Sequence, residues 1–449
     1  MHGILWRSHL KSSMNYRGRL SYRLSSASMT CLGLALAGLG GLLPAHSQEQ
    51  SHNNNQTVHY KIQDLGVVGA NLNEPGQPLV ITNGGWVAGA ARVGSAEHAI
   101  LWHGMQVFDI GKPGLGGNSI ANGMNDWVQA VGEAENTSSK LSTSEDFCGF
   151  KALGFSASPT PCVPFLWNQG KMYPLKTLGG VNGVASYIND YGEITGYTET
   201  ATVDPGCPPP QKYQFKPAIW FQNWIAELPT GNDPDGVAFS GNNLGQVVGT
   251  SGSCAPFNPV WLFNLAPAHA LLWQNGKAID LGNLGGAMNN FAYKINNRGQ
   301  VIGGSDLAGD QTTHAFLWTA ASKMQDLGTV NDSVNNDSYS MGLGINDQGE
   351  IVGISANADF SIARAFIRQN GKLIDLNTLI AGTATLDLIT ACSINAEGEI
   401  IGIALDPNTG QTHAYLAQPT SETVGHQNVS KPVLPPDWVR SWLRLAKVD

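Results

Sequence analysis

The phrase that decides the fold is Ile295-Asn-Asn-Arg-Gly-Gln-Val-Ile-Gly303, which recurs as Ile345-Asn-Asp-Gln-Gly-Glu-Ile-Val-Gly353 and Ile394-Asn-Ala-Glu-Gly-Glu-Ile-Ile-Gly402. Four less regular copies occupy residues 81–89, 124–132, 188–196 and 241–249. All seven copies keep the final glycine, and successive final glycines are 43, 64, 53, 54, 50 and 49 residues apart. This spacing favours the blades of a β-propeller, at about 40–50 residues each, over the shorter coils of a solenoid.

Two further phrases repeat with the same spacing. A His-Ala-Phe-Leu-Trp phrase starts at His98, Pro164, Pro217, His269, His314, Arg364 and His413. The phrase that follows it is clearest as Asp280-Leu-Gly-Asn-Leu-Gly-Gly286. We expect four strands in each repeat: the His-Ala-Phe-Leu-Trp run, the segment ending in Asp-Leu, the segment leading into Ile-Asn, and Gln-Val-Val-Gly. Asn, Asp and Gly supply the backbone angles of the hairpin before the last strand.

The sequence therefore predicts an all-β fold, a seven-bladed β-propeller of four-stranded blades. The 54 glycines and a charged fraction of 13% fit many short strands joined by tight turns. The first repeat begins at Tyr60 without a His-Ala-Phe-Leu strand, and the last such strand, at 413–416, is followed by no further repeat. We expect these N- and C-terminal strands, 60–89 and 413–416, to share one blade and close the ring.

The first 47 residues predict a signal peptide. Basic residues from Arg7 to Arg23 precede an uncharged apolar run at 29–43, and Ala45-His46-Ser47 supplies small residues for cleavage. The run is shorter than the roughly 20 residues that cross a bilayer, which favours a signal peptide over a membrane anchor. We therefore expect a secreted or extracellular protein, with the periplasm as an alternative, and no membrane span after the signal is removed.

The remaining chain divides into three parts by composition. Residues 48–59 read as a polar linker, 60–417 as the propeller, and 418–449 as a C-terminal extension. Within the extension, 435–447 could form a short amphipathic helix that docks on the propeller or attaches to another surface.

Composition and motifs exclude several function classes. The formal net charge is −9, and the chain after the expected signal has no basic block, which argues against nucleic acid or anionic lipid as a partner. Signatures of serine hydrolases, zinc proteases and phosphate-binding loops are absent from the sequence. The Asp- and Asn-rich stretches at 232–236 and 331–337 lack the spacing of a calcium loop and read as solvated turns. We expect no catalytic residue of a known motif, no metal and no cofactor.

The three phrases resemble those of the HAF repeat family of bacterial extracellular proteins, over about residues 60–417. The match is most specific in the fourth and fifth repeats. Pro164, Pro217 and Arg364 replace the leading histidine, and Val128 replaces the hairpin glycine. The resemblance implies export and a repeat fold, and it transfers no catalytic residue.

Three residue types recur at fixed repeat positions, and we interpret them as structural. The histidines would tie strands together, because metal ligands must converge whereas equivalent propeller positions lie around a ring. The tryptophans would wedge between sheets, with a ring of sugar-binding aromatics as the alternative. The asparagines would satisfy the hairpin backbone. These positions are His98, His269, His314 and His413; Trp102, Trp167, Trp220, Trp273 and Trp318; and Asn125, Asn189, Asn242, Asn296, Asn346 and Asn395.

Five cysteines follow the signal, and four of them lie in long insertions of three consecutive repeats. Cys148 and Cys162 share one insertion, whereas Cys207 and Cys254 lie in matching insertions of the next two repeats. Local pairing and loop equivalence predict the disulfides Cys148–Cys162 and Cys207–Cys254. Cys392 lies within an expected strand and would be a buried free thiol.

Two function classes stay open. The first is a non-catalytic binding or scaffold module whose unknown ligand, a glycan or a protein, is recognised on the rim carrying 133–163, 197–216 and 250–268. The second is a secreted carbohydrate-active enzyme with its site at the mouth of the propeller channel, built from carboxylates that pair in space. A cluster of unrepeated carboxylates and aromatics would favour the enzyme, and ring-symmetric residues alone would favour the binding module.

Overall fold

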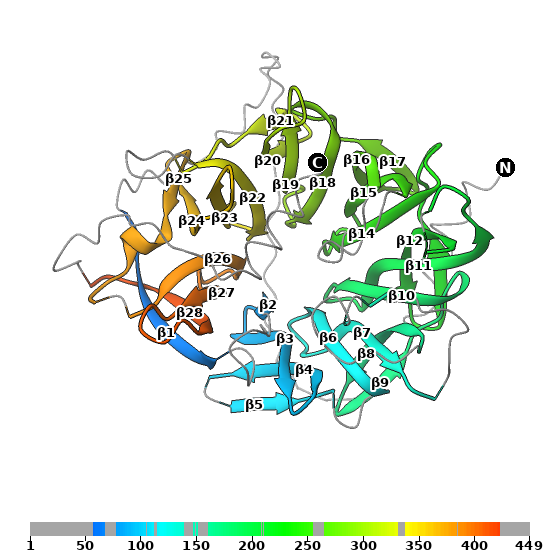
Figure 1. Ribbon diagram of the computed structural model, residues 1–449, viewed down its shortest axis with the longest axis horizontal. Coiled ribbons are helices and arrows are strands. Elements are labelled where there is room, and N and C mark those ends of the chain that lie inside the picture. The colour runs from blue at the N-terminus through cyan, green and yellow to red at the C-terminus, as the bar shows by residue number, and fades with distance from the viewer. Residues whose placement is uncertain are drawn as a thin grey trace, which may run out of the picture. The chain divides into compact units, whose positions relative to one another are not determined.

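The computed structural model describes residues 57–67, 78–104, 106–111, 115–138, 147–148, 150, 160–207, 209, 211–254, 265–330, 337–383 and 385–422. Their strands form seven four-stranded antiparallel sheets that follow one another round a ring, as the blades of a β-propeller (Figure 1). The expected fold is confirmed. The expected signal peptide, most of the polar linker and the C-terminal extension from residue 423 lie outside the described residues. Within those residues, no helix is long and apolar enough to cross a bilayer.

Six blades take four consecutive strands each. β2–β5 span Pro78–Ile81, Trp86–Val93, Ala96–His103 and Gln106–Asp109. β6–β9 span Gly116–Met124, Ala130–Asn136, Cys162–Asn168 and Lys171–Pro174. β10–β13 span Gly179–Ile188, Glu193–Val203, Tyr213–Phe221 and Trp224–Glu227. β14–β17 span Asp235–Gly241, Val247–Cys254, Leu265–Gln274 and Lys277–Asp280. β18–β21 span Gly285–Ile295, Val301–Leu307, Thr313–Thr319 and Lys323–Asp326. β22–β25 span Asp337–Ile345, Ile351–Asn357, Ala363–Gln369 and Lys372–Asp375, and a 3₁₀ turn, η1, follows at Leu376–Leu379.

Each blade begins two strands later than the expected repeat. β14 leads into the hairpin at Asn242, β15 begins with the Val-Val-Gly of the hairpin phrase, β16 carries His-Ala-Leu-Leu-Trp, and β17 ends at Asp280. The expected four-strand repeat began with the His-Ala-Phe-Leu-Trp strand, which is β16 here. The first two strands of that repeat therefore belong to one blade, and its last two strands belong to the next blade. The glycine-rich phrase after Asp280 is therefore the crossover between blades, which explains the positive φ angles of Gly282 and Gly285.

The seventh blade joins the two ends of the described chain. It contains β26 (Asp387–Ile394), β27 (Ile400–Leu405), β28 (Thr412–Thr420) and, beside β28, β1 (His59–Val67). The expected closure by terminal strands is confirmed. The expected N-terminal part of this blade, residues 60–89, was too long. β2 and β3, which run from residue 78 past Gly89, belong to the next blade. β28 extends to Thr420, three residues beyond the expected end of the propeller, and it pairs on both sides.

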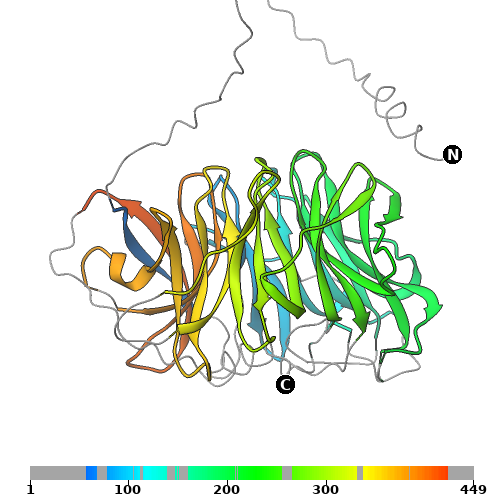
Figure 2. The same ribbon diagram turned by 90° about the horizontal axis from the view of Figure 1, so that it is seen from above.

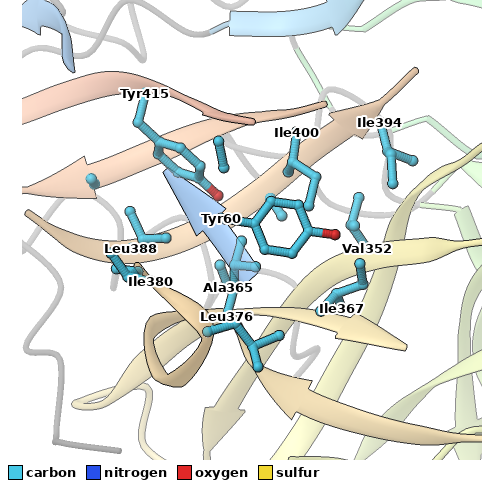
Figure 3. Packing of buried hydrophobic residues seen from close by; sticks show 14 of the residues in the cluster. Tyr60, Val352, Ala365, Ile367, Leu376, Ile380, Leu388, Ile394, Ile400 and Tyr415 are labelled. Atoms are coloured by element: carbon cyan, nitrogen blue, oxygen red, sulfur yellow. The ribbon is translucent and has the colours of Figure 1, made fainter. Parts of the chain in front are cut away.

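Tyr60 anchors β1 in the closing blade. Its side chain is 1% exposed and packs beside Tyr415 of β28, Ile400 of β27 and Val352 of the preceding blade (Figure 3). Its backbone oxygen accepts a hydrogen bond of 2.7 Å from the nitrogen of Ala381. The terminal strand is therefore held by apolar burial as well as by sheet pairing.

The invariant glycine of the hairpin phrase marks a close approach of two strands. A Cβ atom at Gly303 would collide with the carbonyl oxygen of Phe291 on β18. Five further copies would meet an innermost-strand carbonyl in the same way: Gly132, Gly196, Gly249, Gly353 and Gly402. Glycine is thus required at this position by the backbone spacing.

A β-bulge lies beside each of these contacts, in the first strand of every blade. One residue is extra in β2, β6, β10, β14, β18, β22 and β26: Leu79, Asn122, Ser186, Phe239, Tyr293, Leu343 and Cys392. Bulges increase local twist and redirect the side chains next to them. This repeated bulge determines which residues face the centre of the ring.

Removing residues 413–449 should destroy the closing blade, whereas removing 423–449 should leave it intact. The first truncation deletes β28, the strand that pairs with both β27 and β1, and exposes two strand edges that promote aggregation. Size-exclusion chromatography and thermal unfolding would measure the difference. Equal solubility and equal melting temperatures for the two truncated proteins would contradict closure.

Candidate functional site

The seven hairpins that contain the Ile-Asn phrase surround one end of the central channel. They enclose a cavity of about 180 Å³, and all seven blades contribute residues to its wall. This volume holds about six water molecules and is smaller than the roughly 300–1,000 Å³ of pockets for drug-sized ligands. We call this cavity and its hairpins the hairpin mouth; the hairpins are residues 82–85, 125–128, 189–192, 242–245, 296–299, 346–349 and 395–398.

Each repeated asparagine holds its own hairpin and also the next blade. The Oδ1 of Asn296 accepts hydrogen bonds from the backbone nitrogens of Arg298 (3.1 Å) and Gln300 (3.0 Å). Its Nδ2 donates to the Gln300 side chain at 2.8 Å and to the backbone oxygen of Asn346, in the next blade, at 2.8 Å. The side chain of Asn296 therefore uses both its oxygen and its nitrogen while it is buried.

Six such inter-blade bonds run round the ring in one direction. Asn125, Asn189, Asn242, Asn296, Asn346 and Asn395 each donate to the backbone oxygen of their counterpart in the following blade. The first blade has Thr82 at this position, and threonine has no side-chain nitrogen to donate. The expected turn-capping role is present, and the inter-blade bond is an additional role that a hairpin sequence alone does not reveal.

The second residues of the seven hairpins form a second ring of hydrogen bonds. At six of the seven junctions the backbone nitrogen of the second residue donates to a side-chain oxygen in the next hairpin, at 2.7–3.1 Å. The members are Asn83, Asp126, Asp190, Asn243, Asn297, Asp347 and Ala396. The side-chain amides of Asn83, Asn243 and Asn297 also bind a carboxylate of the ring, at 2.7–2.8 Å. Three carboxylates are thereby held in place at the hairpin mouth.

The third hairpin residue reaches over the next hairpin. The indole nitrogen of Trp127 donates to the backbone oxygen of Asp190 at 3.0 Å, and Arg298 reaches the backbone oxygen of Asp347 at 3.3 Å. At this position three consecutive blades present exposed apolar side chains: Trp127 is 73%, Tyr191 72% and Leu244 68% exposed. We call these three residues the apolar arc.

The wall of the cavity below the hairpins combines hydroxyl groups with one ammonium group. Tyr187, Ser240, Lys294 and Ser393 line it, each of them following a bulged residue. Burial lowers the pKa of Lys294 to about 8, and its Nζ lies 5.4 Å from the centroid of the Tyr293 ring. The cavity therefore offers a strong donor among hydroxyl groups that both donate and accept.

Cys392 is the bulged residue of the closing blade. It is free, as expected, but only partly buried. Burial raises the pKa of the thiol to about 11, and its sulfur lies 3.3 Å from Oγ1 of Thr390. The thiol is therefore protonated at neutral pH and unreactive.

The repeated histidines join strands. The Nδ1 atom of each lies 2.9 Å from a carboxylate oxygen: His98 pairs with Asp109, His314 with Asp326, His413 with Asp64, and His269 with Asp233. Three of these partners lie on the adjacent outer strand, and Asp233 lies in the segment before β14. Among the described residues, one group has metal-ligand spacing, Cys207, Asp235 and Cys254, and both of its cysteines belong to a disulfide.

Arg364 takes the place of histidine in the sixth blade. Its Nη2 lies 2.6 Å from Asp337, its Nη1 lies 3.7 Å from Asp375, and all three side chains are buried. Asp337 was expected in a solvated turn, and this was wrong. Asp235, from the other stretch interpreted as a solvated turn, is also buried, where its carboxylate accepts from the backbone nitrogen of Phe215 at 3.0 Å. The Asp337 carboxylate thus joins strands within one blade, and the Asp235 carboxylate joins two neighbouring blades.

The repeated tryptophans pack between blades. Trp220 and Trp273 are buried, and their indole nitrogens donate to the backbone oxygens of Lys176 and Pro229, in the crossovers from the preceding blades, both at 2.7 Å. Trp102 and Trp318 are also buried, and Trp167 packs against a buried cluster. These contacts favour the wedge interpretation. The two most exposed aromatics among the described residues, Trp127 and Tyr191, lie instead at the third hairpin position.

Both expected disulfides are present, Cys148–Cys162 and Cys207–Cys254. The strands of each blade run between the two faces of the ring (Figure 2), so successive connections alternate between these faces. The described ends of the cysteine-bearing insertions therefore lie on the face opposite the hairpin mouth. Phe150, Tyr197 and Leu265 share one buried cluster with the cysteines, which places the described parts of the three insertions side by side, as expected. Residues 139–146, 149, 151–159, 208, 210 and 255–264 of these insertions are outside the description.

No family model matches the chain, and no curated protein matches its sequence. Among solved structures, it is similar to the β-propeller domain of the Trilobed protease from Pyrococcus furiosus, with 7% identity over 83% of this chain and 100% of that one and a TM-score of 0.44. It is similar to a puromycin hydrolase (12% identity, 82% and 55% of the two chains, TM-score 0.44) and to Trypanosoma rangeli sialidase (8%, 76% and 54%, TM-score 0.35). The chain spans about half the length of these two enzymes. The likeness concerns the propeller fold alone.

Thr82→Asn should stabilise the protein. The new amide would donate to the backbone oxygen of Asn125 and complete the ring of inter-blade bonds, a gain of about 0.5–1.5 kcal/mol in the free energy of unfolding. Denaturant unfolding of the wild type, Thr82→Asn and the control Thr82→Ser would measure it. Thr82→Asn that is no more stable than Thr82→Ser would show that the inter-blade bond contributes nothing at this junction.

Glu97→Gln should weaken the pH dependence of stability. Burial raises the pKa of Glu97 from 4.5 to about 8 in the folded protein, so the folded state binds this proton more tightly than the unfolded state. The resulting stabilisation is complete below about pH 4.5 and is lost as the pH rises through about 8. Because glutamine cannot ionise, the variant should lose less of its melting temperature than the wild type between pH 5 and pH 8.5. Glu227→Gln, at an exposed carboxylate on β13, is the control, and identical pH profiles for wild type and Glu97→Gln would contradict the expectation.

Proposed function

We propose that this protein is an exported, non-catalytic binding module that holds a small polar group of its ligand in the hairpin mouth. The observation that carries the proposal is the cavity of about 180 Å³ whose wall is built by all seven blades. A cavity at the convergence of a whole ring of rigid strands is a concave site with a few converging polar groups, as small-ligand sites usually are.

The hydrogen-bonded rings support binding because they fix the polar groups in advance. Asp126, Asp190 and Asp347 each accept a backbone hydrogen bond from the preceding hairpin. A ligand that donates to these carboxylates would find them already ordered, so little conformational entropy is lost on binding. The carboxylates keep further lone pairs for a ligand.

The carboxylates at the mouth favour binding over glycoside hydrolysis. All three occupy the same repeat position, whereas hydrolysis needs an acid and a base or nucleophile in different environments. Two carboxyl groups whose pKa is strongly raised, Glu97 (about 8) and Asp235 (about 7), are buried side chains outside the wall of the cavity. The ring symmetry of the mouth therefore supports the binding class.

The hairpin mouth replaces the insertion rim as the candidate site. The described parts of the insertions at 133–163, 197–216 and 250–268 contain two disulfides and a buried apolar cluster, which supports a structural role for them. Recognition on that rim stays a prediction. Export is supported by the disulfides, which form in oxidising compartments, and by the resemblance to the HAF repeat family.

A variant that fills the cavity tests the proposal. The purified chain is screened on an array of immobilised neutral and acidic glycans and on a peptide array, and each bound probe is then titrated against Ser240→Phe. We expect affinity to fall at least tenfold, because the new ring occupies the cavity, while the control Ala320→Phe, on an exposed turn, binds normally. Unchanged binding by a folded Ser240→Phe protein would refute the proposed site, and release of shortened glycans, seen by mass spectrometry, would show an enzyme.

A further inference from the structure

We infer that the ligand is a neutral glycan whose terminal sugar enters the cavity while the next sugars lie across Trp127 and Tyr191. This inference rests on the proposed function and adds to it the ligand class and the direction in which the ligand leaves the cavity. It is carried by the position of the apolar arc beside the second hydrogen-bonded ring.

Trp127 is an exposed side chain that is nevertheless held in one orientation. The residue is 73% exposed, yet its indole nitrogen donates to the backbone oxygen of Asp190 at 3.0 Å. Exposed aromatic clusters commonly mark interaction sites. A fixed aromatic face loses little entropy when a flat apolar surface stacks on it, and the C–H face of a sugar ring is such a surface.

Asp190 links this aromatic platform to the polar mouth. Its backbone oxygen receives the indole of Trp127, and its carboxylate accepts from the backbone nitrogen of Asp126 (3.1 Å) and the side-chain amide of Asn243 (2.7 Å). Sugar hydroxyls donate well to ionised carboxylates. A sugar stacked on Trp127 would therefore meet fixed acceptors at the edge of its ring.

The cavity itself selects a neutral ligand. Lys294 lies in its wall, and its ammonium would repel a cationic group such as a lysine side chain. Asp126, Asp190 and Asp347 also line the cavity and would repel a phosphate or a carboxylate. A polyhydroxylated group suits both charges because each hydroxyl donates and accepts.

The side chains at the third hairpin position set the direction in which the glycan leaves the cavity. Trp127, Tyr191 and Leu244 follow one another on three consecutive blades, whereas Arg298, Gln348 and Glu397 occupy the next three. The apolar arc covers one side of the mouth only. A glycan that leaves the cavity would pass over this side, where its apolar faces find partners.

The test compares short and long probes of the same sugar. The probes are the monosaccharides and tetrasaccharides of β1,4-linked glucose, β1,4-linked N-acetylglucosamine, β1,4-linked mannose and α1,4-linked glucose, with tetragalacturonate and tetralysine as charged alternatives. Titration calorimetry measures each against the wild type, Trp127→Ala, Tyr191→Ala and Ser240→Phe. Trp224→Ala is the matched control, because Trp224 is 51% exposed on the outer strand β13, away from the mouth.

We expect at least one neutral tetrasaccharide to bind, with affinity that falls tenfold or more in Trp127→Ala and in Tyr191→Ala. Trp127→Phe should bind more tightly than Trp127→Ala but more weakly than the wild type, since it keeps an aromatic face and loses the indole hydrogen bond to Asp190, and Trp224→Ala should retain full affinity. The corresponding monosaccharide, held by the cavity alone, should be weakened by Ser240→Phe but not by Trp127→Ala. Circular dichroism would establish that each variant is folded.

The outcomes separate the inference from the proposed function. A tetrasaccharide whose binding is lost in Ser240→Phe but unchanged in Trp127→Ala and Tyr191→Ala would overturn the inference and leave the function standing. Binding of tetralysine or tetragalacturonate alone, or of no neutral tetrasaccharide, would also overturn the inference. If probes bind but none of them loses affinity in Ser240→Phe, the proposed site itself is overturned.

Discussion

The side-chain amide of the repeated asparagine is the interaction on which the ring depends. Its oxygen caps the hairpin that starts it, and its nitrogen binds the backbone of the next hairpin, as Asn296 does toward Arg298, Gln300 and Asn346. Both groups are buried, so losing either partner would leave a polar atom unsatisfied. One residue type at one repeat position therefore specifies the local turn and the spacing between blades together.

Because the first two residues of each hairpin make the bonds between blades, the side chain at the third position can vary. The first residue of each hairpin holds the blades, the second forms the ring of amides and carboxylates, and the third points outward. Its side chain ranges from Trp127 and Tyr191 to Arg298 and Glu397, and in each case its backbone nitrogen still donates to the asparagine that caps the hairpin. Binding residues are commonly found on loops that a rigid scaffold positions, which is why the proposed binding surface is the apolar arc and not the repeated tryptophans.

Features that depend on repetition or on local pairing could be predicted from the sequence. Seven glycines at nearly regular spacing were enough for the propeller, and loop equivalence was enough for Cys207–Cys254. The strand at which each blade begins could not be derived from the sequence. Successive strands of a repeat array can be grouped in fours in more than one way until their hydrogen bonds are known. The burial of Asp235 and Asp337 was missed because polar, Asn-rich stretches resemble turns, and their partners Phe215 and Arg364 lie on other strands. Trp127 was missed for a related reason, since exposure is a property of the assembled face.

The gaps in the two rings show how the closed structure tolerates a degenerate sequence. Thr82 breaks the first ring between the first and second blades, but there Asn83 makes two bonds to Asp126. Ala396 breaks the second ring between the sixth and seventh blades, but there Asn346 still donates to the next hairpin at 2.9 Å. The junction between the seventh and first blades keeps both bonds. No described junction lacks both, so each substitution removes one bond of a pair, and the ring closes around a mouth whose polar groups stay in place.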